Sequence, residues 1–247
     1  MGNLTPSSWL ERPAGRLAYR HRPGKGPTII FLPGYASDMA GTKALVLEAW
    51  ATRCGRAMLR LDYSGCGESE GHFEDGTLAA WRDDALAVIE AVAPGPLLLV
   101  GSSMGGWLML LVALALGDQV RGMVGIAAAP DFTDWGFGEA EMAVLQETGR
   151  LERASEYGPE PMLTTRGFWE SGQANLLLGG PIAIDCPVRL LHGQRDADVP
   201  WAIAMQLAER LRSDDVQVTL IKDGDHRLSR PQDLALLVTI VERMLET

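Results

Sequence analysis

Apolar runs alternate with stretches of helical spacing along most of the chain. The runs lack the strict polar alternation of half-exposed strands, which is typical of strands covered on both faces in a parallel sheet. They predict strands over residues 28–32, 57–61, 97–100, 123–127, 188–191 and 216–221. The stretches between them predict helices over residues 40–52, 78–92, 105–116, 201–212 and 232–245. This order favours an α/β fold with a mostly parallel, doubly wound sheet.

Two segments depart from this order. Residues 17–20, before Pro23-Gly24, predict an antiparallel hairpin at the edge of the sheet. Residues 131–181 contain no convincing strand but many apolar groups, and an insertion of about fifty such residues is seldom a bare loop. They predict a small helical cap, inserted after the sixth strand and packed over the carboxyl ends of the strands. Its aromatic candidates for substrate contact, which also suit packing, are Trp135, Phe137 and Trp169.

Bulk properties narrow the class of protein. With 247 residues the chain can bury a large core, and we expect residues 1–247 to form one domain with the cap inserted. The net charge of −10 disfavours nucleic acids and anionic membranes, which attract basic surfaces. The longest apolar run, residues 107–116, is about half of what a bilayer requires, so no integral membrane segment is predicted. Three scattered cysteines and the lack of an export signal favour a cytoplasmic protein.

The motif Gly101-Ser102-Ser103-Met104-Gly105 lies between a predicted strand and a predicted helix. Strand, G-x-S-x-G and helix in this order are typical of a nucleophile elbow. The turn is so tight that side chains two residues on either side of the serine would collide with neighbouring elements, which explains the glycines. Backbone N–H groups of the following helix would stabilise an oxyanion at the same place. We therefore expect Ser103 to be the nucleophile.

A serine nucleophile needs a base, and imidazole suits that task near neutral pH. His226 follows the last predicted strand, where the chain order Ser…Asp…His places the base. The remaining histidines of the four suit structural or exposed roles: they are His21 in the hairpin, His72 in a loop and His192 at a strand end.

The other groups of such a site should lie in loops at the ends of strands. Asp196 is the first candidate for the carboxylate that orients the imidazole, and Asp198 and Asp131 remain alternatives. Tyr35 follows a proline–glycine pair after an early strand, so its N–H is expected to join that of Met104 in an oxyanion hole.

No cofactor is expected from the sequence. Histidine, cysteine and carboxylate residues form no cluster with metal-ligand spacing, so no metal site is predicted. The glycines of residues 62–69 lack the lysine of a phosphate-binding loop and the full dinucleotide fingerprint.

The sequence resembles the α/β-hydrolase serine hydrolases related to the mitochondrial palmitoyl-protein thioesterase that is also called mycophenolic acid acyl-glucuronide esterase. The similar runs are longer than the general fold signature and comprise residues 33–35, 41–45, 62–65, 67–69, 101–110, 186–193, 199–201 and 225–227. The resemblance implies an α/β-hydrolase fold and places the triad of the family on Ser103, Asp196 and His226. It also implies hydrolysis of carboxylic esters or thioesters, including medium-to-long acyl thioesters such as palmitoyl-protein, or acyl glucuronides. The substrate would then be a small molecule or an acylated protein.

Two other functions remain open. A serine triad also serves carbon–carbon bond hydrolases and other cofactor-free reactions, so the motif alone does not separate them from an esterase. A binding protein built on a hydrolase scaffold is the second alternative, although such proteins usually lack part of the triad.

Overall fold

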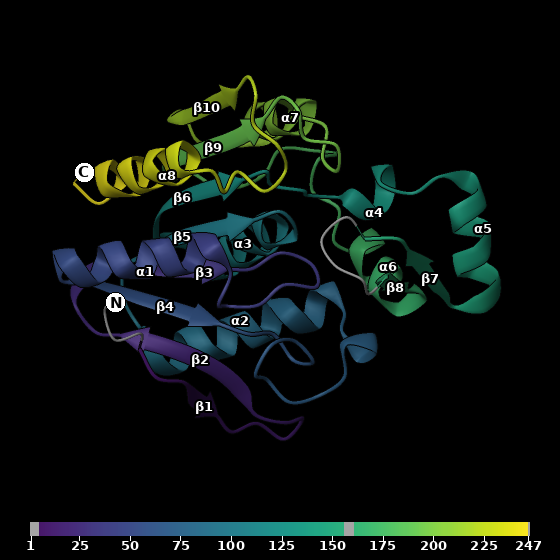
Figure 1. Cartoon of the computed structure of the whole chain (residues 1–247), viewed down its shortest axis with the longest axis horizontal. Coiled ribbons are helices and arrows are strands. Elements are labelled where there is room, and N and C mark those ends of the chain that lie inside the picture. The colour runs from purple at the N-terminus through teal and green to yellow at the C-terminus, as the bar shows by residue number, and fades with distance from the viewer. Residues whose placement is uncertain (1–4, 156–160, 247) are drawn as a thin grey trace.

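A computed structural model describes residues 5–155 and 161–246. Its main sheet has eight strands in the order β1-β2-β4-β3-β5-β6-β9-β10 (Figure 1). Pairing is antiparallel between β1 and β2 and between β2 and β4, and parallel in the rest of the sheet. The strands are β1 Ser8–Leu10, β2 Leu17–Arg22, β3 Lys25–Leu32, β4 Arg56–Leu61, β5 Leu97–Ser102, β6 Val120–Ile126, β9 Val188–Gly193 and β10 Val216–Ile221.

Helices cover both faces of this sheet, as Figure 1 shows. The face with α1 and α8 and the face with α2, α3 and α7 each bury their own apolar cluster. These helices are α1 Thr42–Cys54, α2 Leu78–Val92, α3 Met104–Leu116, α7 Ala202–Arg210 and α8 Pro231–Met244. Short 3-10 turns lie at Phe73–Asp75 and Gly117–Gln119. The predicted α/β-hydrolase fold with a mostly parallel sheet is therefore confirmed.

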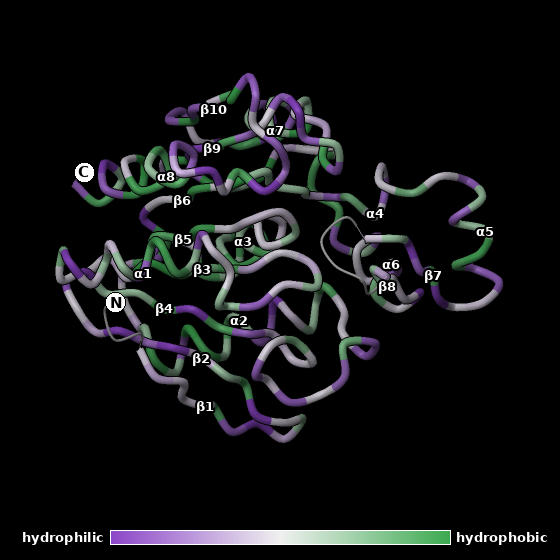
Figure 2. The backbone as a smooth tube through the Cα atoms, in the orientation of Figure 1, coloured by the Kyte–Doolittle hydropathy of each residue, from purple (hydrophilic) through white to green (hydrophobic). Residues whose placement is uncertain are grey.

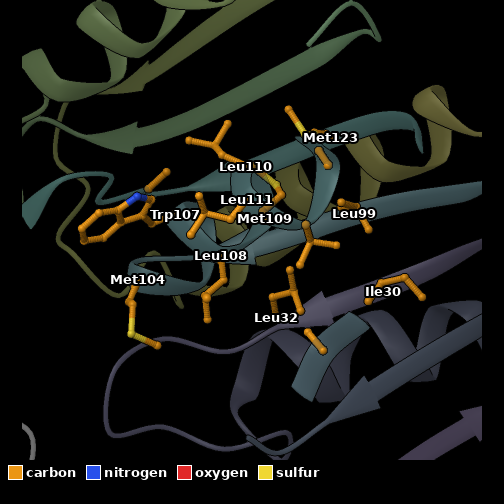
Figure 3. Close-up of a cluster of buried hydrophobic side chains, with 14 of the residues drawn as sticks. Ile30, Leu32, Leu99, Met104, Trp107, Leu108, Met109, Leu110, Leu111 and Met123 are labelled. Carbon is orange, nitrogen blue, oxygen red and sulfur yellow. The ribbon is translucent and has the colours of Figure 1, made fainter. Parts of the chain in front are cut away.

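Helix α3 is the centre of the apolar core. Its residues from Met104 to Ala113 are buried, because a helix that is hydrophobic all round must be enclosed. Leu108 and Leu110 of this helix belong to the same buried cluster as Leu32 and Leu99 of the central strands (Figure 3). In Figure 2 the hydrophobic colour runs through the middle of the sheet, and the polar colour gathers on the outer turns. The residue that precedes α3 is thus held on a rigid, fully packed base.

The predicted antiparallel hairpin at the edge of the sheet is present, and the partner of β2 in it is β1, which precedes β2 in the chain. Strand β2 pairs with β1 and β4, whereas β3 lies two places further in, between β4 and β5. Strand β3 lies inside the sheet because its last residues are buried, as is typical of a strand with a neighbour on each side. Between β2 and β3 the chain crosses the start of β4, where a Cβ on Gly24 would lie 2.5 Å from the backbone of Arg56.

The segment between β6 and β9 stands at the carboxyl ends of the central strands (Figure 1). It contains α4 Phe132–Trp135, α5 Glu139–Thr148 and α6 Arg166–Gln173, and also an antiparallel pair, β7 Arg150–Arg153 with β8 Met162–Thr165. The prediction of a purely helical cap is therefore wrong in this respect. Strands of four residues each are too short to leave a readable alternation in the sequence.

No helix within residues 5–155 and 161–246 has both the length and the apolar character needed to cross a membrane.

Candidate active site

Ser103 is the single residue between β5, which ends at Ser102, and α3, which begins at Met104. Its backbone has φ 56° and ψ −122°, a conformation that a residue with a side chain rarely adopts. Three backbone hydrogen bonds hold it there: its N–H donates to Ile126 O at 2.9 Å, and its carbonyl accepts from Gly106 N and Ala129 N. The surrounding structure therefore fixes the strained turn that the motif predicts.

The two glycines of the motif are required by close backbone approach. A Cβ on Gly101 would fall on the carbonyl group of Gly105, and a Cβ on Gly105 would fall on the carbonyl oxygens of Leu32 and Pro33. These are backbone atoms of packed elements, so they cannot move aside as a flexible side chain could.

Replacing Gly105 by alanine should lower the free energy of unfolding by about 2 kcal/mol, because the added methyl group meets backbone atoms of β3. Urea denaturation measures the change. The matched control is Gly167→Ala on α6, where an added Cβ has nothing within 4 Å. That variant should be as stable as the parent or more stable, by up to about 1 kcal/mol. Equal stability of Gly105→Ala and the parent would contradict the proposed packing of the turn.

His226 lies in the loop between β10 and α8, within hydrogen-bond distance of the elbow. Its Nε2 is 3.1 Å from Ser103 Oγ, and its Nδ1 is 2.8 Å from Asp196 Oδ2. A carboxylate only accepts, so the proton of the neutral ring lies on Nδ1, and Nε2 accepts from the serine hydroxyl. Lys43 of α1 donates from Nζ to the carbonyl oxygen of Arg227 at 2.6 Å, which attaches this loop to the helix. Burial, with the charge of Arg227 nearby, lowers the pKa of Lys43 to about 8.

Asp196, in the loop between β9 and α7, has a fully buried side chain. Its Oδ1 accepts the N–H groups of Asp198 and Val199, at 2.9 and 2.8 Å, and its Oδ2 faces His226 and His192. Burial raises the pKa of Asp196, but these donors outweigh it and hold the pKa well below its ordinary value. The group is therefore a carboxylate throughout the neutral range.

Three other aspartates lie near the candidate triad in the sequence or were alternatives to Asp196, and each has contacts of its own. Asp131 accepts the N–H groups of Leu177 and Leu178, which ties the segment after α6 to the end of β6. Asp198 lines the same cavity as Ser103, and the carboxylate bonded to His226 Nδ1 is that of Asp196. Asp225, which precedes His226, accepts the N–H of Leu228 in a turn.

Tyr35 and Met104, whose backbone N–H groups are the expected oxyanion-hole donors, both line the cavity that contains Ser103. Within the described residues neither N–H has an acceptor, so both are available to a ligand. The Tyr35 ring packs on Phe168 at 4.8 Å between centroids, and its hydroxyl donates to Leu163 O of β8 at 2.7 Å. These contacts fix the Tyr35 loop against the segment that covers the site. Burial raises the pKa of Tyr35, so the hydroxyl stays protonated.

Two cavities meet at Ser103 and His226. One, of about 180 Å³, lies under the segment that follows β6 and is mainly apolar: its lining includes Met104, Ala129, Phe132, Trp135, Phe137 and Met162. The other, of about 290 Å³, is more polar and is lined by Ser37, Asp38, Thr42, Lys43 and Arg227 among others. Trp135 and Phe137 thus border the apolar cavity. Trp169 does not border either one, because its indole N–H donates to Thr133 O inside the cap.

In the described part of the chain one group of side chains has metal-ligand spacing: Asp196, Asp198 and His226, whose ligand atoms lie within 4.8 Å of one another. Asp196 and His226 already bond to each other, so a cation there would compete with that bond. Burial raises the pKa of the Cys66 thiol to about 12 and that of the Cys186 thiol to about 11, so these two thiols stay protonated at neutral pH.

One functional candidate was missed from the sequence. His192 was expected to serve packing at a strand end, and it is indeed fully buried, but its Nε2 lies 3.2 Å from Asp196 Oδ2. Its only signal in the sequence is its place at the carboxyl end of a strand, four residues before Asp196.

Comparison with known proteins gives consistent results. Residues 29–236 match the sequence profile of the alpha/beta hydrolase family. The palmitoyl-protein thioesterase ABHD10 of Homo sapiens is 42% identical, and the match covers 98% of this chain and 81% of that protein. The structure of alpha/beta hydrolase domain-containing protein 10 from mouse has a TM-score of 0.91 at 39% identity, covering 97% of this chain and 98% of the other. A structure from Agrobacterium vitis S4, described as that of a hydrolase, has a TM-score of 0.91 at 43% identity and covers 98% of both chains.

These relatives correct the expected location. The prediction of a cytoplasmic protein is wrong, because the ABHD10 proteins that this chain resembles are mitochondrial by name. That prediction relied on scattered cysteines and on the lack of an export signal, and neither identifies a compartment.

The recognised resemblance and the predicted enzyme class are confirmed together. The family profile spans most of this chain, and the human relative is 42% identical over 98% of this chain. This chain belongs to the alpha/beta hydrolase family, and it is a serine hydrolase.

Proposed function

We propose that this hydrolase is a thioesterase that removes medium-to-long acyl groups, with palmitoylated protein as the substrate class and Ser103, His226 and Asp196 as its catalytic triad. The observation that carries the proposal is the unbroken chain of hydrogen bonds from Ser103 Oγ through His226 to Asp196, which begins at a strained elbow. The name of the human relative, palmitoyl-protein thioesterase, supports the substrate class.

The reaction follows from this geometry. Ser103 Oγ attacks the acyl carbonyl while His226 Nε2 accepts the hydroxyl proton, and Asp196 stabilises the imidazolium that forms. The N–H groups of Tyr35 and Met104 bind the oxyanion of the tetrahedral intermediate. His226 then returns its proton to the leaving thiol or alcohol. Water, activated by the same imidazole, releases the acid and restores the serine.

The two cavities give the substrate an orientation. The apolar cavity takes the acyl chain, because burial of methylene groups against Phe132, Trp135 and Phe137 is favourable. The polar cavity takes the leaving group, which for an acylated protein is a cysteine and its neighbouring residues. In this scheme residues 1–247 act as a single domain, and the inserted cap, residues 131–181, supplies one wall of the acyl site.

The test is a series of thioesters of one small thiol, with acyl chains from acetyl to palmitoyl, beside the matching oxyesters. We expect kcat/KM to rise with chain length. Phe137→Ala should lower kcat/KM about tenfold for a dodecanoyl thioester but by less than about twofold for the acetyl thioester, since only the longer chain reaches the ring. The matched control is Val144→Ala on α5, an exposed cap residue, which should behave like the parent.

Two outcomes would contradict the proposal. The first is a rate that does not depend on chain length, with equal losses for short and long chains in Phe137→Ala. The second is cleavage of a vinylogous diketone without turnover of any ester or thioester, which would favour carbon–carbon bond hydrolysis.

A further inference from the structure

A second imidazole lies against the buried carboxylate of the site. His192 is near the end of β9, a strand that has β6 on one side and β10 on the other, and its side chain is completely buried. The Asp196 side chain is equally buried. Because solvent screens neither group, the protonation state of each depends strongly on its contacts with the other.

The contacts of His192 define its tautomer. Its Nε2 lies 3.0 Å from the carbonyl oxygen of Val199 and 3.2 Å from Asp196 Oδ2. Both atoms only accept, so Nε2 carries a proton. Nδ1 is buried and has no hydrogen-bond partner among the described residues. A proton there would create an enclosed cation with an unsatisfied N–H, so the ring is neutral with its proton on Nε2.

The proton on His192 Nε2 contacts two residues of the loop between β9 and α7, Asp196 and Val199. Asp196 Oδ1 is fixed by the N–H groups of Asp198 and Val199, and Oδ2 is shared by the two imidazoles. The His192 N–H has Val199 O as its nearer acceptor, at 3.0 Å, and Asp196 Oδ2 as the second, at 3.2 Å. Rotation of the carboxylate away from His226 would therefore break contacts to the loop and to β9 together.

We propose that His192 is a positioning residue for this reaction: its Nε2–H holds Asp196 in register with His226 and takes up part of the carboxylate charge. The proposal rests on the triad roles proposed above. His192 does not touch the substrate, and it acts only through Asp196.

Removal of this donor has a consequence that packing alone would not produce. Asp196 Oδ2 would then bond to His226 alone, so its charge would stabilise the His226 imidazolium more strongly. The midpoint of the acid limb of kcat/KM would move to higher pH. The other ionisable groups near His226 stay the same in every variant: they are Asp198 in the Asp196 loop, Asp225 and Arg227 beside it, and Lys43 from α1.

The experiment compares His192→Phe, which keeps the ring shape without a donor, with His192→Gln, whose amide nitrogen can take the place of Nε2. Rates on a neutral acyl thioester are measured from pH 5 to 9 and divided by the active-site count from a fluorophosphonate titration. For His192→Phe we expect a loss of about tenfold in kcat, a KM within about twofold and an upward midpoint shift of about 0.5 pH unit. His192→Gln should restore kcat to within about threefold and the midpoint to that of the parent.

Two kinetic results would overturn the proposal: a parental kcat and midpoint in His192→Phe, or equal losses in both variants with no shift, which is what a packing role predicts. If His192→Phe does not fold, histidine side-chain ¹⁵N spectra of the parent test the proposal by showing which ring nitrogen of His192 carries the proton. A neutral His192 protonated on Nε2 supports the proposal, and a proton on Nδ1 overturns it. Failure of the proposed function can be distinguished from failure of the His192 proposal, because only in the former would turnover survive Ser103→Ala.

Discussion

Ser103→Ala should lower kcat for a long-chain acyl thioester by on the order of 10⁴- to 10⁶-fold, the largest loss expected of any single substitution. The hydroxyl is the atom that forms the acyl-enzyme bond, and it lies 3.1 Å from the base, His226 Nε2. The fold should be unaffected, because alanine removes one oxygen from a half-buried side chain and keeps the backbone bonds of the turn. Steady-state kinetics and circular dichroism on the same sample measure both effects.

The neighbouring serine provides the control for this variant. Ser102 is the last residue of β5, and Ser102→Ala removes a hydroxyl of the same motif without touching the elbow. It should keep at least about a tenth of the parental rate. If Ser103→Ala retains the parental rate, or if Ser102→Ala suffers the larger loss, the nucleophile has been assigned to the wrong residue.

Asp196→Asn should reduce kcat by about 10³- to 10⁴-fold with little change in KM. An asparagine oxygen can still accept the N–H groups of Asp198 and Val199, which leaves its NH₂ group facing two imidazole N–H donors. His226 would have to turn over or change its tautomer, so that Nε2 no longer accepts the serine proton. Kinetics on the thioester series, together with a crystal structure of the variant, measure the effect and its cause.

Asp198→Asn and Asp131→Asn are the comparisons, because both carboxylates fit the sequence as the orienting group. Each should lose no more than about tenfold in kcat, since the carboxylate bonded to His226 Nδ1 at 2.8 Å belongs to Asp196. A greater loss in Asp198→Asn than in Asp196→Asn would transfer the orienting role to Asp198.

The central elements and the elbow could be predicted from the sequence because one physical signal dominated each. Helix α2 occupies the predicted residues 78–92, since its apolar spacing is regular and Thr77 caps it by accepting the N–H of Ala80. Buried parallel strands need apolar residues on both faces, so their runs are readable without a partner. The motif glycines predicted the elbow because a Cβ at either position would meet backbone.

Features that depend on tertiary pairing could not be predicted in this way. Strands β7 and β8 have four residues each, and they are strands only because each provides hydrogen-bond partners to the other. Strand β2 was predicted as part of an antiparallel hairpin at the sheet edge, but its pairing with β4 was not, because that pairing is set by the need to enclose β3. Trp169 resembles its neighbours as an apolar cap residue, and only the bond to Thr133 O shows which way it points.

The second imidazole illustrates the same limit within the site. A histidine at a strand end has many uses, and the sequence contains no feature that separates a packing residue from a hydrogen-bond donor. What separates them is the 3.2 Å between His192 Nε2 and Asp196 Oδ2, together with the enclosure of both side chains. Distances between loops and strands arise from the assembled sheet rather than from local spacing.

The most direct measurement of the central claim is a peptide map, by mass spectrometry, of the parent enzyme after complete inactivation with a hexadecyl fluorophosphonate. We expect a single adduct on the peptide that carries residues 101–105, with fragment ions that place it on Ser103, and a loss of activity in step with one adduct per chain. An adduct on another residue with Ser103 unmodified, or full inactivation without any adduct, would contradict it.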